Sequence, residues 1–136
     1  MYIEIPMRTN NILCMASIYV QIACYRDPEI VPTIKDLYEK SSGDNTINVC
    51  IAWQHTPEES IAELTKYENV TILDIPHTKT KGTCWARSLL NSYYNNEQFT
   101  LMLDSHHRFE KNWDRTCIEM ITGLQADGYS KPLLTS

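Results

Sequence analysis

The chain has 136 residues, of which 43% are hydrophobic, and carries a net charge of −5 at pH 7. This length suits one domain with a substantial core, and an acidic balance without a basic run argues against a partner such as nucleic acid. No apolar run approaches the roughly 20 residues of a transmembrane helix, and the first residues lack a signal-peptide pattern, so no membrane association is expected.

Cysteine usage indicates a reducing compartment, and we expect a cytoplasmic protein. The five cysteines are scattered, odd in number and free of any C-x-x-C pair, which argues against a zinc site, a redox motif or a disulfide framework. Two of them lie within apolar runs and are predicted to be buried free thiols, Cys24 and Cys50.

The first half of the chain begins with an irregular N-terminal arm over residues 1–16, with room for a short edge strand. A run rich in β-branched residues predicts the first strand over 17–24. The first helix is predicted over 32–42, because a proline deep inside a helix would clash with the preceding turn, and Gly43 suits the left-handed residue that ends it.

A second strand is predicted over 47–53 and a third over 70–75. Between them, Thr56-Pro57-Glu58-Glu59 has the pattern of a helix start, with a Thr cap, Pro at the first position and Glu three residues after the cap. The apolar positions of the predicted helix are Ile61, Leu64 and Tyr67.

The second half predicts a helix over about 83–94 and a fully buried strand over 99–103. Asp114 is predicted to cap a last long helix, and residues 132–136 have the pattern of the start of a further strand.

The repeated alternation of strands and helices predicts an α/β three-layer sandwich with a mostly parallel central sheet. In such sheets, ligands bind outside the carboxyl ends of the strands. Polar residues gather at those predicted ends, which carry Tyr25-Arg26-Asp27, Gln54-His55, Asp74 and Asp104-Ser105-His106.

The D-x-H sequence after the buried strand has two interpretations. If the chain stays extended, Asp104 and His106 point the same way, and their oxygen and nitrogen atoms could hold a divalent cation. The alternative is an ordinary Asp-Ser turn followed by solvated histidines.

Glycine-rich loops that cradle phosphates are absent, and the chain has only four glycines. A phosphate ligand would therefore need a metal ion and cationic side chains. Nitrogen in the ligand set favours Mn²⁺ over Mg²⁺. Arg87 could face the same edge of the sheet, or it could be a surface arginine of its helix. No nucleophile or paired catalytic carboxylates are apparent, so the catalytic residues stay unknown.

A series of motifs favours the cation-site interpretation of the D-x-H sequence over the ordinary turn. In order and spacing, the chain resembles the UDP-GlcNAc:polypeptide α-N-acetylglucosaminyltransferases, a family that includes the cytoplasmic hydroxyproline GlcNAc-transferases. The resemblance covers about 18–136 and rests on Ala23-Cys24-Tyr25-Arg26-Asp27-Pro28-Glu29, Pro32-Thr33-Ile34, Cys50-Ile51-Ala52-Trp53-Gln54, Cys84-Trp85-Ala86-Arg87, Leu103-Asp104-Ser105-His106, Arg108-Phe109, Trp113-Asp114 and Leu134-Thr135-Ser136.

The resemblance implies a GT-A glycosyltransferase fold with a Rossmann-like nucleotide-binding half. It also implies a UDP-sugar donor and retaining transfer of the sugar to a polypeptide hydroxyl. Asp104 and His106 would bind Mn²⁺ or Mg²⁺, and Arg87 would lie near the diphosphate or the donor sugar. The residues implied near the uridine are Tyr25, Arg26 and Asp27.

The family's catalytic domain is about twice as long, so residues 17–136 are expected to be a truncated nucleotide-sugar-binding domain, the N-terminal donor-binding half. Two alternatives stay open: a non-catalytic nucleotide-sugar-binding module, and an unrelated α/β protein in which the D-x-H is a turn. The exposed edge of the sheet is expected to allow pairing with another copy, a homo-oligomer, or with another chain.

Overall fold

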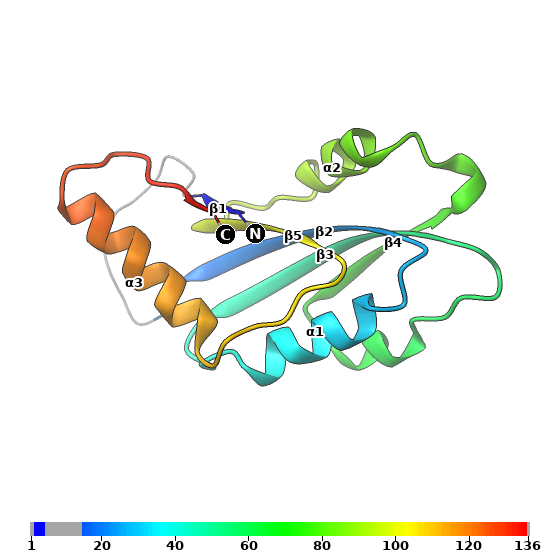
Figure 1. The fold of residues 1–136 in the computed structure, drawn as a ribbon, viewed down its shortest axis with the longest axis horizontal. Coiled ribbons are helices and arrows are strands. Elements are labelled where there is room, and N and C mark those ends of the chain that lie inside the picture. Colours follow the sequence, from blue (N-terminus) through cyan, green and yellow to red (C-terminus); the bar gives the residue numbers. More distant parts are fainter. Residues whose placement is uncertain (1, 5–14, 136) are drawn as a thin grey trace.

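The computed structural model describes residues 2–4 and 15–135. Its centre is one mixed six-stranded sheet in the order β4-β3-β2-β5-β1-β6 (Figure 1). Four neighbouring strands are parallel: β2 (Ser17–Tyr25), β3 (Thr46–His55), β4 (Val70–Pro76) and β5 (Phe99–Asp104). The predicted α/β class with a mostly parallel sheet is confirmed.

Two short strands complete the sheet beside β5. β1 (Tyr2–Glu4) pairs antiparallel with β5 on one side and with β6 (Leu134–Thr135) on the other. The strand expected near residues 132–136 therefore forms. The short strand within the N-terminal arm lies inside the sheet rather than at its edge. Pairing with another copy through an open edge stays a prediction.

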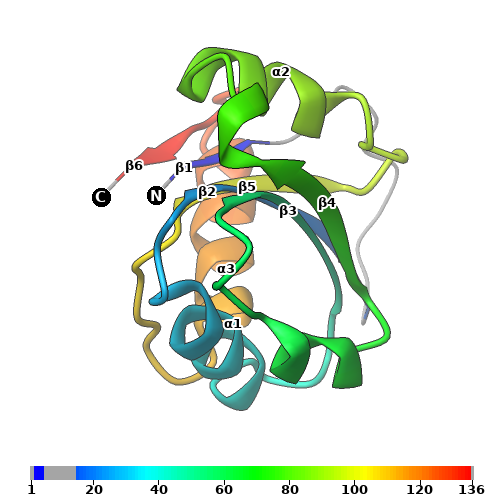
Figure 2. The same ribbon diagram turned by 90° about the vertical axis from the view of Figure 1, so that its right-hand side faces the viewer.

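Helices cover both faces of the sheet, which gives three layers (Figures 1 and 2). α2 (Thr83–Asn91) lies on one face, and α1 (Ile30–Glu39) and α3 (Trp113–Ala126) lie on the other. Side chains alternate along β2, so that Val20 and Ile22 join the larger core under α1 and α3, whereas Tyr19 joins the smaller core under α2.

The first helix begins and ends earlier than predicted, at Ile30 and Glu39. Pro32 is its third residue, where the backbone N–H would have no partner within the helix, so the ring is tolerated there. Gly43 does adopt a left-handed conformation (φ 82°), but four residues beyond the end of the helix. The helix predicted over 83–94 ends at Asn91.

The helix predicted after Thr56 is a short 3₁₀ helix instead, η1 (Ala62–Lys66). Half of the expected capping box forms, because the Thr56 backbone N–H donates to the Glu59 carboxylate at 2.7 Å. The apolar residues, however, recur every third position, which matches the 3.0-residue turn of a 3₁₀ helix. Ile61 and Leu64 are buried, and Tyr67 stacks on Tyr38 of α1 with ring centroids 4.8 Å apart.

Asp114 is not the cap of the last helix, because α3 begins at Trp113 and its N-cap is Asn112. The Asp114 carboxylate is fully buried and accepts hydrogen bonds from the Ser42 backbone N–H, the Ser42 hydroxyl and the Asn45 amide, at 2.7–2.8 Å. Burial raises the pKa of Asp114, but these hydrogen bonds outweigh it and lower the pKa. Asp114 thus joins α3 to the loop before β3.

Cys24 and Cys50 are buried free thiols, as predicted, and Cys84 and Cys117 are also free. Cys14 lies outside the described residues. None of the helices among the described residues combines the length and apolar character that a membrane crossing requires.

Replacing Asp114 by Ala should lower the free energy of unfolding by about 2–3 kcal/mol, because it leaves buried donors without an acceptor. Urea unfolding followed by circular dichroism measures this change. Glu119→Ala, on an exposed position of the same helix, should change stability by less than about 0.5 kcal/mol. Equal stability of the two variants would contradict the role of Asp114.

Candidate functional site

The carboxyl ends of the parallel strands form one rim of the sheet. The register aligns Tyr25 of β2 with Gln54 of β3, and Ala23 of β2 with Asp104 of β5. The predicted site residues lie at the ends of β2 and β5, with Arg87 reaching the rim from α2.

The Asp104 side chain faces α2 and forms an ion pair with Arg87. The Arg87 Nη2 atom lies 3.5 Å from Asp104 Oδ1, and the Asp104 side chain is 68% exposed, so this carboxylate remains accessible. The Arg87 Nη1 atom is buried and has no hydrogen-bond partner among the described residues. A partly exposed guanidinium beside an accessible carboxylate suits an anionic ligand that carries its own cation.

The His106 side chain instead points toward the end of β2, where it forms a hydrogen bond with Asp27. The Asp27 Oδ2 atom lies 2.9 Å from His106 Nδ1 and accepts a hydrogen bond from the Ser105 hydroxyl at 2.6 Å. The hydrogen bond to Asp27 is the main cause that raises the pKa of His106. Burial raises the pKa of Asp27, but hydrogen bonds from Ser105, His106 and the Glu29 backbone N–H lower it more.

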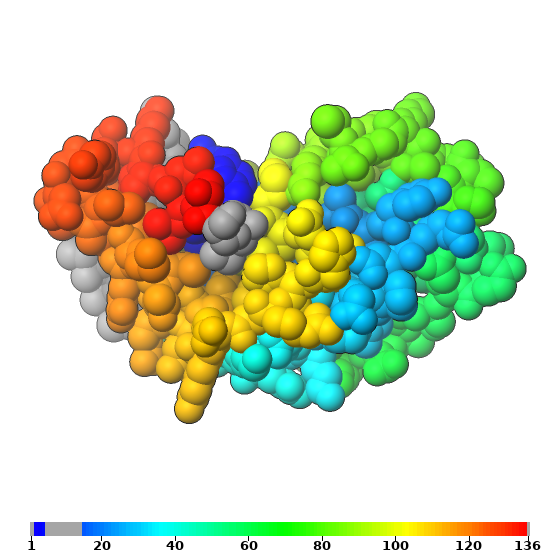
Figure 3. Space-filling view, viewed as in Figure 1, coloured from blue at the N-terminus to red at the C-terminus, as the bar shows by residue number. Residues whose placement is uncertain are grey.

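The chain is not extended from Asp104 to His106, because β5 ends at Asp104 and the next two residues form a bend. Buried Thr33 of α1 holds this bend: its hydroxyl donates to the Ser105 carbonyl at 2.8 Å and accepts from the His107 backbone N–H at 3.0 Å. Figure 3 shows the segment after β5, in yellow, against the start of α1, in blue. Sequence reasoning missed this role of Thr33.

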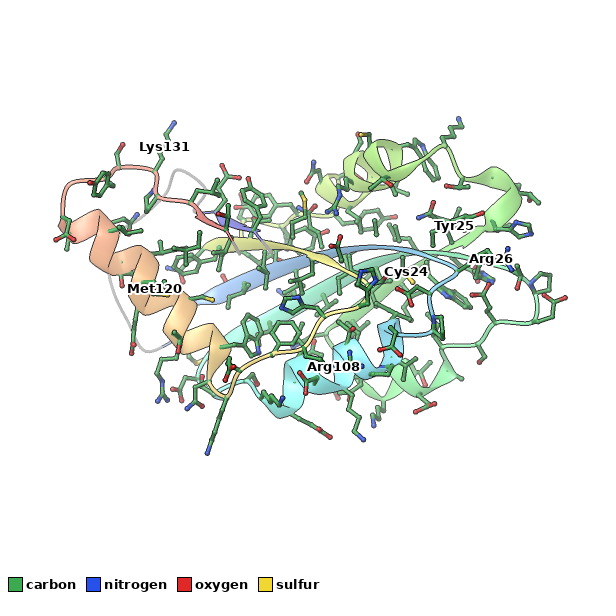
Figure 4. The ribbon with its side chains drawn as sticks, in the orientation of Figure 1. Cys24, Tyr25, Arg26, Arg108, Met120 and Lys131 are labelled. Atoms are coloured by element: carbon green, nitrogen blue, oxygen red, sulfur yellow. The ribbon has the colours of Figure 1, made fainter. Side chains whose placement is uncertain are left out.

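Tyr25 and Arg26 lie together at the end of β2 (Figure 4). Tyr25 is 53% exposed. Arg26 has a left-handed backbone (φ 49°), and its guanidinium Nε lies 3.9 Å from the Glu59 carboxylate. Within residues 2–4 and 15–135, no hydrogen bond or ion pair joins either side chain to Asp104 or His106.

A pocket of about 560 Å³ opens on the α1 side of the rim. Asp27 and the first turn of α1 form one wall, and Trp53 and the loop after β3 form the other. The residues that line it are Asp27, Pro28, Val31, Pro32, Lys35, Trp53, Glu59, Ser60, Ile61 and Glu63.

A second histidine–aspartate pair, missed by sequence reasoning, joins the ends of β3 and β4. His55 Nε2 lies 2.6 Å from Asp74 Oδ1, and His55 Nδ1 lies 2.9 Å from the Thr56 carbonyl oxygen. Both neighbours are acceptors, so the arrangement favours the doubly protonated ring. Burial lowers the pKa of His55, but the hydrogen bonds to Asp74 and to the Thr56 carbonyl, with the charges of Asp74 and Glu59, together outweigh it and raise the pKa. The ring stacks on Trp53 with centroids 3.5 Å apart.

Two side chains at the rim carry atoms of the kinds that bind divalent cations. Asp104 offers a carboxylate, and His106 offers a ring nitrogen that Asp27 does not occupy. Across the described part of the chain, no group of three or more His, Cys, Asp or Glu side chains is arranged to hold a metal. Two protein donors with the remaining positions left to phosphate oxygens and water are typical of cations bound with a nucleotide.

The His55–Asp74 pair should make stability depend on pH. Because the folded-state pKa of His55 is raised, its stabilisation is fully present below the unfolded value of about 6.5 and is lost as the pH rises through the folded pKa. Wild type should therefore lose roughly 0.5–1 kcal/mol relative to His55→Gln between pH 6 and pH 9. Thermal unfolding at several pH values measures this, as a melting-temperature shift of about 1–4 °C.

Asp74→Asn removes the partner and should flatten the same pH dependence, since the neutral amide no longer favours the charged ring. A wild-type protein whose melting temperature tracks that of both variants at every pH would exclude the pair as a pH-dependent contact.

Comparison with known families identifies the chain. Residues 17–68 and 60–136 match the family model described as Glycosyltransferase (GlcNAc), and together these segments cover most of the sequence. A comparison with curated protein sequences gave no significant match. Membership implies an N-acetylglucosamine donor and an acceptor for the sugar. The rim of polar residues at the strand ends lies within the matched segments, and the chain belongs to the GlcNAc glycosyltransferase family.

Proposed function

We propose that this protein binds UDP-GlcNAc with a divalent cation and transfers the sugar, with retention, to a polypeptide hydroxyl in the cytoplasm. The family match supports GlcNAc transfer. The polypeptide acceptor, the retention of configuration and the compartment rest on the resemblance to the polypeptide α-N-acetylglucosaminyltransferases.

The observation that carries the donor site is the contact of Arg87 with Asp104 at the carboxyl end of β5. A diphosphate placed there would lie beside the partly exposed Arg87 guanidinium and beside a cation held by the carboxylate. Arg87 would neutralise phosphate charge from the α2 side, and Tyr25 and Arg26 are exposed at the end of β2 where a uridine would extend.

Asp104 and His106 are the residues that would hold the cation, Mn²⁺ or Mg²⁺. When bound, the cation would offset the diphosphate charge and stabilise UDP as the leaving group. The protein's own contribution is placement, because the bend after β5 is fixed by hydrogen bonds to Thr33 and Asp27.

Isothermal titration calorimetry with UDP tests the site, with and without Mn²⁺. Wild type should bind UDP more tightly when Mn²⁺ is present. Asp104→Ala should weaken metal-dependent binding at least tenfold, about 1.4 kcal/mol, with little change in stability because the side chain is exposed. Glu110→Ala removes the same charge from an exposed position nearby and should bind as wild type does. Folded wild-type protein without Mn²⁺-dependent UDP binding would refute the donor site.

Replacing Arg87 by Met should weaken UDP binding in the presence of Mn²⁺ by about tenfold, because it removes the cation that faces the diphosphate. Uridine, which has no phosphate, should bind wild type and Arg87→Met equally. An equal loss of uridine affinity in Arg87→Met would show that Arg87 does not act on the diphosphate.

A second candidate function is a non-catalytic module that binds the nucleotide sugar. It is favoured by the rim, where the contact of Arg87 with Asp104 and the exposed Tyr25 suit the donor. The two candidates differ in turnover, so release of UDP from UDP-GlcNAc in the presence of Mn²⁺ separates them. Binding without any UDP release or transfer would support the module.

A further inference from the structure

We propose that Asp27 is a positioning residue, which fixes the ring of His106 with Nδ1 protonated and Nε2 left free for the cation. This inference rests on the metal site of the proposed function, and it assigns Asp27 a task other than contact with the uridine.

The hydrogen bonds around Asp27 determine which ring nitrogen carries the proton. Asp27 Oδ2 lies 2.9 Å from His106 Nδ1 and also accepts from the Ser105 hydroxyl at 2.6 Å. Asp27 Oδ1 accepts from the Glu29 backbone N–H at 3.0 Å. An ionised carboxylate has no proton to give, so Nδ1 must be the donor. In the neutral ring, Nε2 then carries the lone pair that a metal requires.

His106 needs such a tether, because its side chain is 67% exposed and follows a bend. The Asp27 side chain is only 21% exposed, and its two other hydrogen bonds fix its orientation. A carboxylate held in this way restricts the ring to one tautomer and one orientation, as carboxylates do behind histidine ligands in metal sites.

The isosteric change Asp27→Asn should reverse the tautomer. The Glu29 backbone N–H requires an oxygen at the Oδ1 position, so the amide nitrogen must take the place of Oδ2. That nitrogen is a donor and faces His106 Nδ1, which must then accept. The proton moves to Nε2, the nitrogen assigned to the cation, and metal binding should weaken although the shape of the side chain is kept.

Histidine ring nitrogens can be followed by long-range ¹H–¹⁵N correlation spectra of metal-free, ¹⁵N-labelled protein at a pH where the ring is neutral. The chain has four histidines, and His106→Gln assigns the signals of interest. Wild type should show the Nδ1–H tautomer of His106, and Asp27→Asn should shift it to Nε2–H.

Calorimetry with Mn²⁺ and UDP then measures how the change of tautomer affects metal-dependent UDP binding. Asp27→Asn should weaken Mn²⁺-dependent UDP binding about tenfold to a hundredfold. Asp44→Asn is the control, because it removes one charge from an exposed carboxylate that pairs with Arg115 away from the rim, and it should bind as wild type does.

The outcomes separate this inference from the proposed function. Wild-type protein with His106 in the Nε2–H tautomer would overturn the inference without any variant. An Asp27→Asn protein with unchanged tautomer and unchanged affinity would also overturn it. Wild-type protein that has the Nδ1–H tautomer but no Mn²⁺-dependent UDP binding would overturn the proposed donor site while confirming the contact between Asp27 and His106.

Discussion

The parallel pairing of β2 with β3 on one side and with β5 on the other is the constraint on which the rest of the structure depends. β2 is buried on both faces along most of its length, so a slip by one residue would exchange the side chains of its two cores. The register fixed in this way places the ends of three strands at one rim. The polar segments that follow them must then meet there, whatever ligand they bind.

Buried and half-buried polar side chains hold the segments beyond the strands in place. Thr33 joins α1 to the bend after β5, Asp27 joins the end of β2 to the same bend, and Asp114 joins α3 to the loop before β3. Each of these groups makes several hydrogen bonds, which removes the cost of burying it. Polar contacts between segments far apart in the sequence therefore stabilise the rim, whereas apolar packing stabilises the sheet.

The strands and their common rim could be predicted from the sequence, because β-branched runs that end in polar residues carry that information locally. The family could be identified from the spacing of several motifs together. Other features depend on partners that are distant in the sequence. Ile61, Leu64 and Tyr67 recur every third position, but the contact that holds Tyr67 is with Tyr38 of α1, which is distant in the sequence. An Asp at a helix start resembles a cap, and only the position of Ser42 shows that Asp114 has another role. The pairing of His106 with Asp27 likewise depends on the register between β2 and β5.

The short strand β1 has a consequence for the order in which the sheet can assemble. β6 contacts the sheet through β1, and β1 joins it through β5. Among the described strands, β6 thus has no pairing partner until β1 has docked, and this contact joins segments that lie far apart in the sequence. Such distant pairings carry the largest loop-closure entropy and form late. A substitution that weakens the pairing of β1 with β5 should therefore detach β6 as well, and leave the pairing of the parallel strands β2 to β5 unaffected.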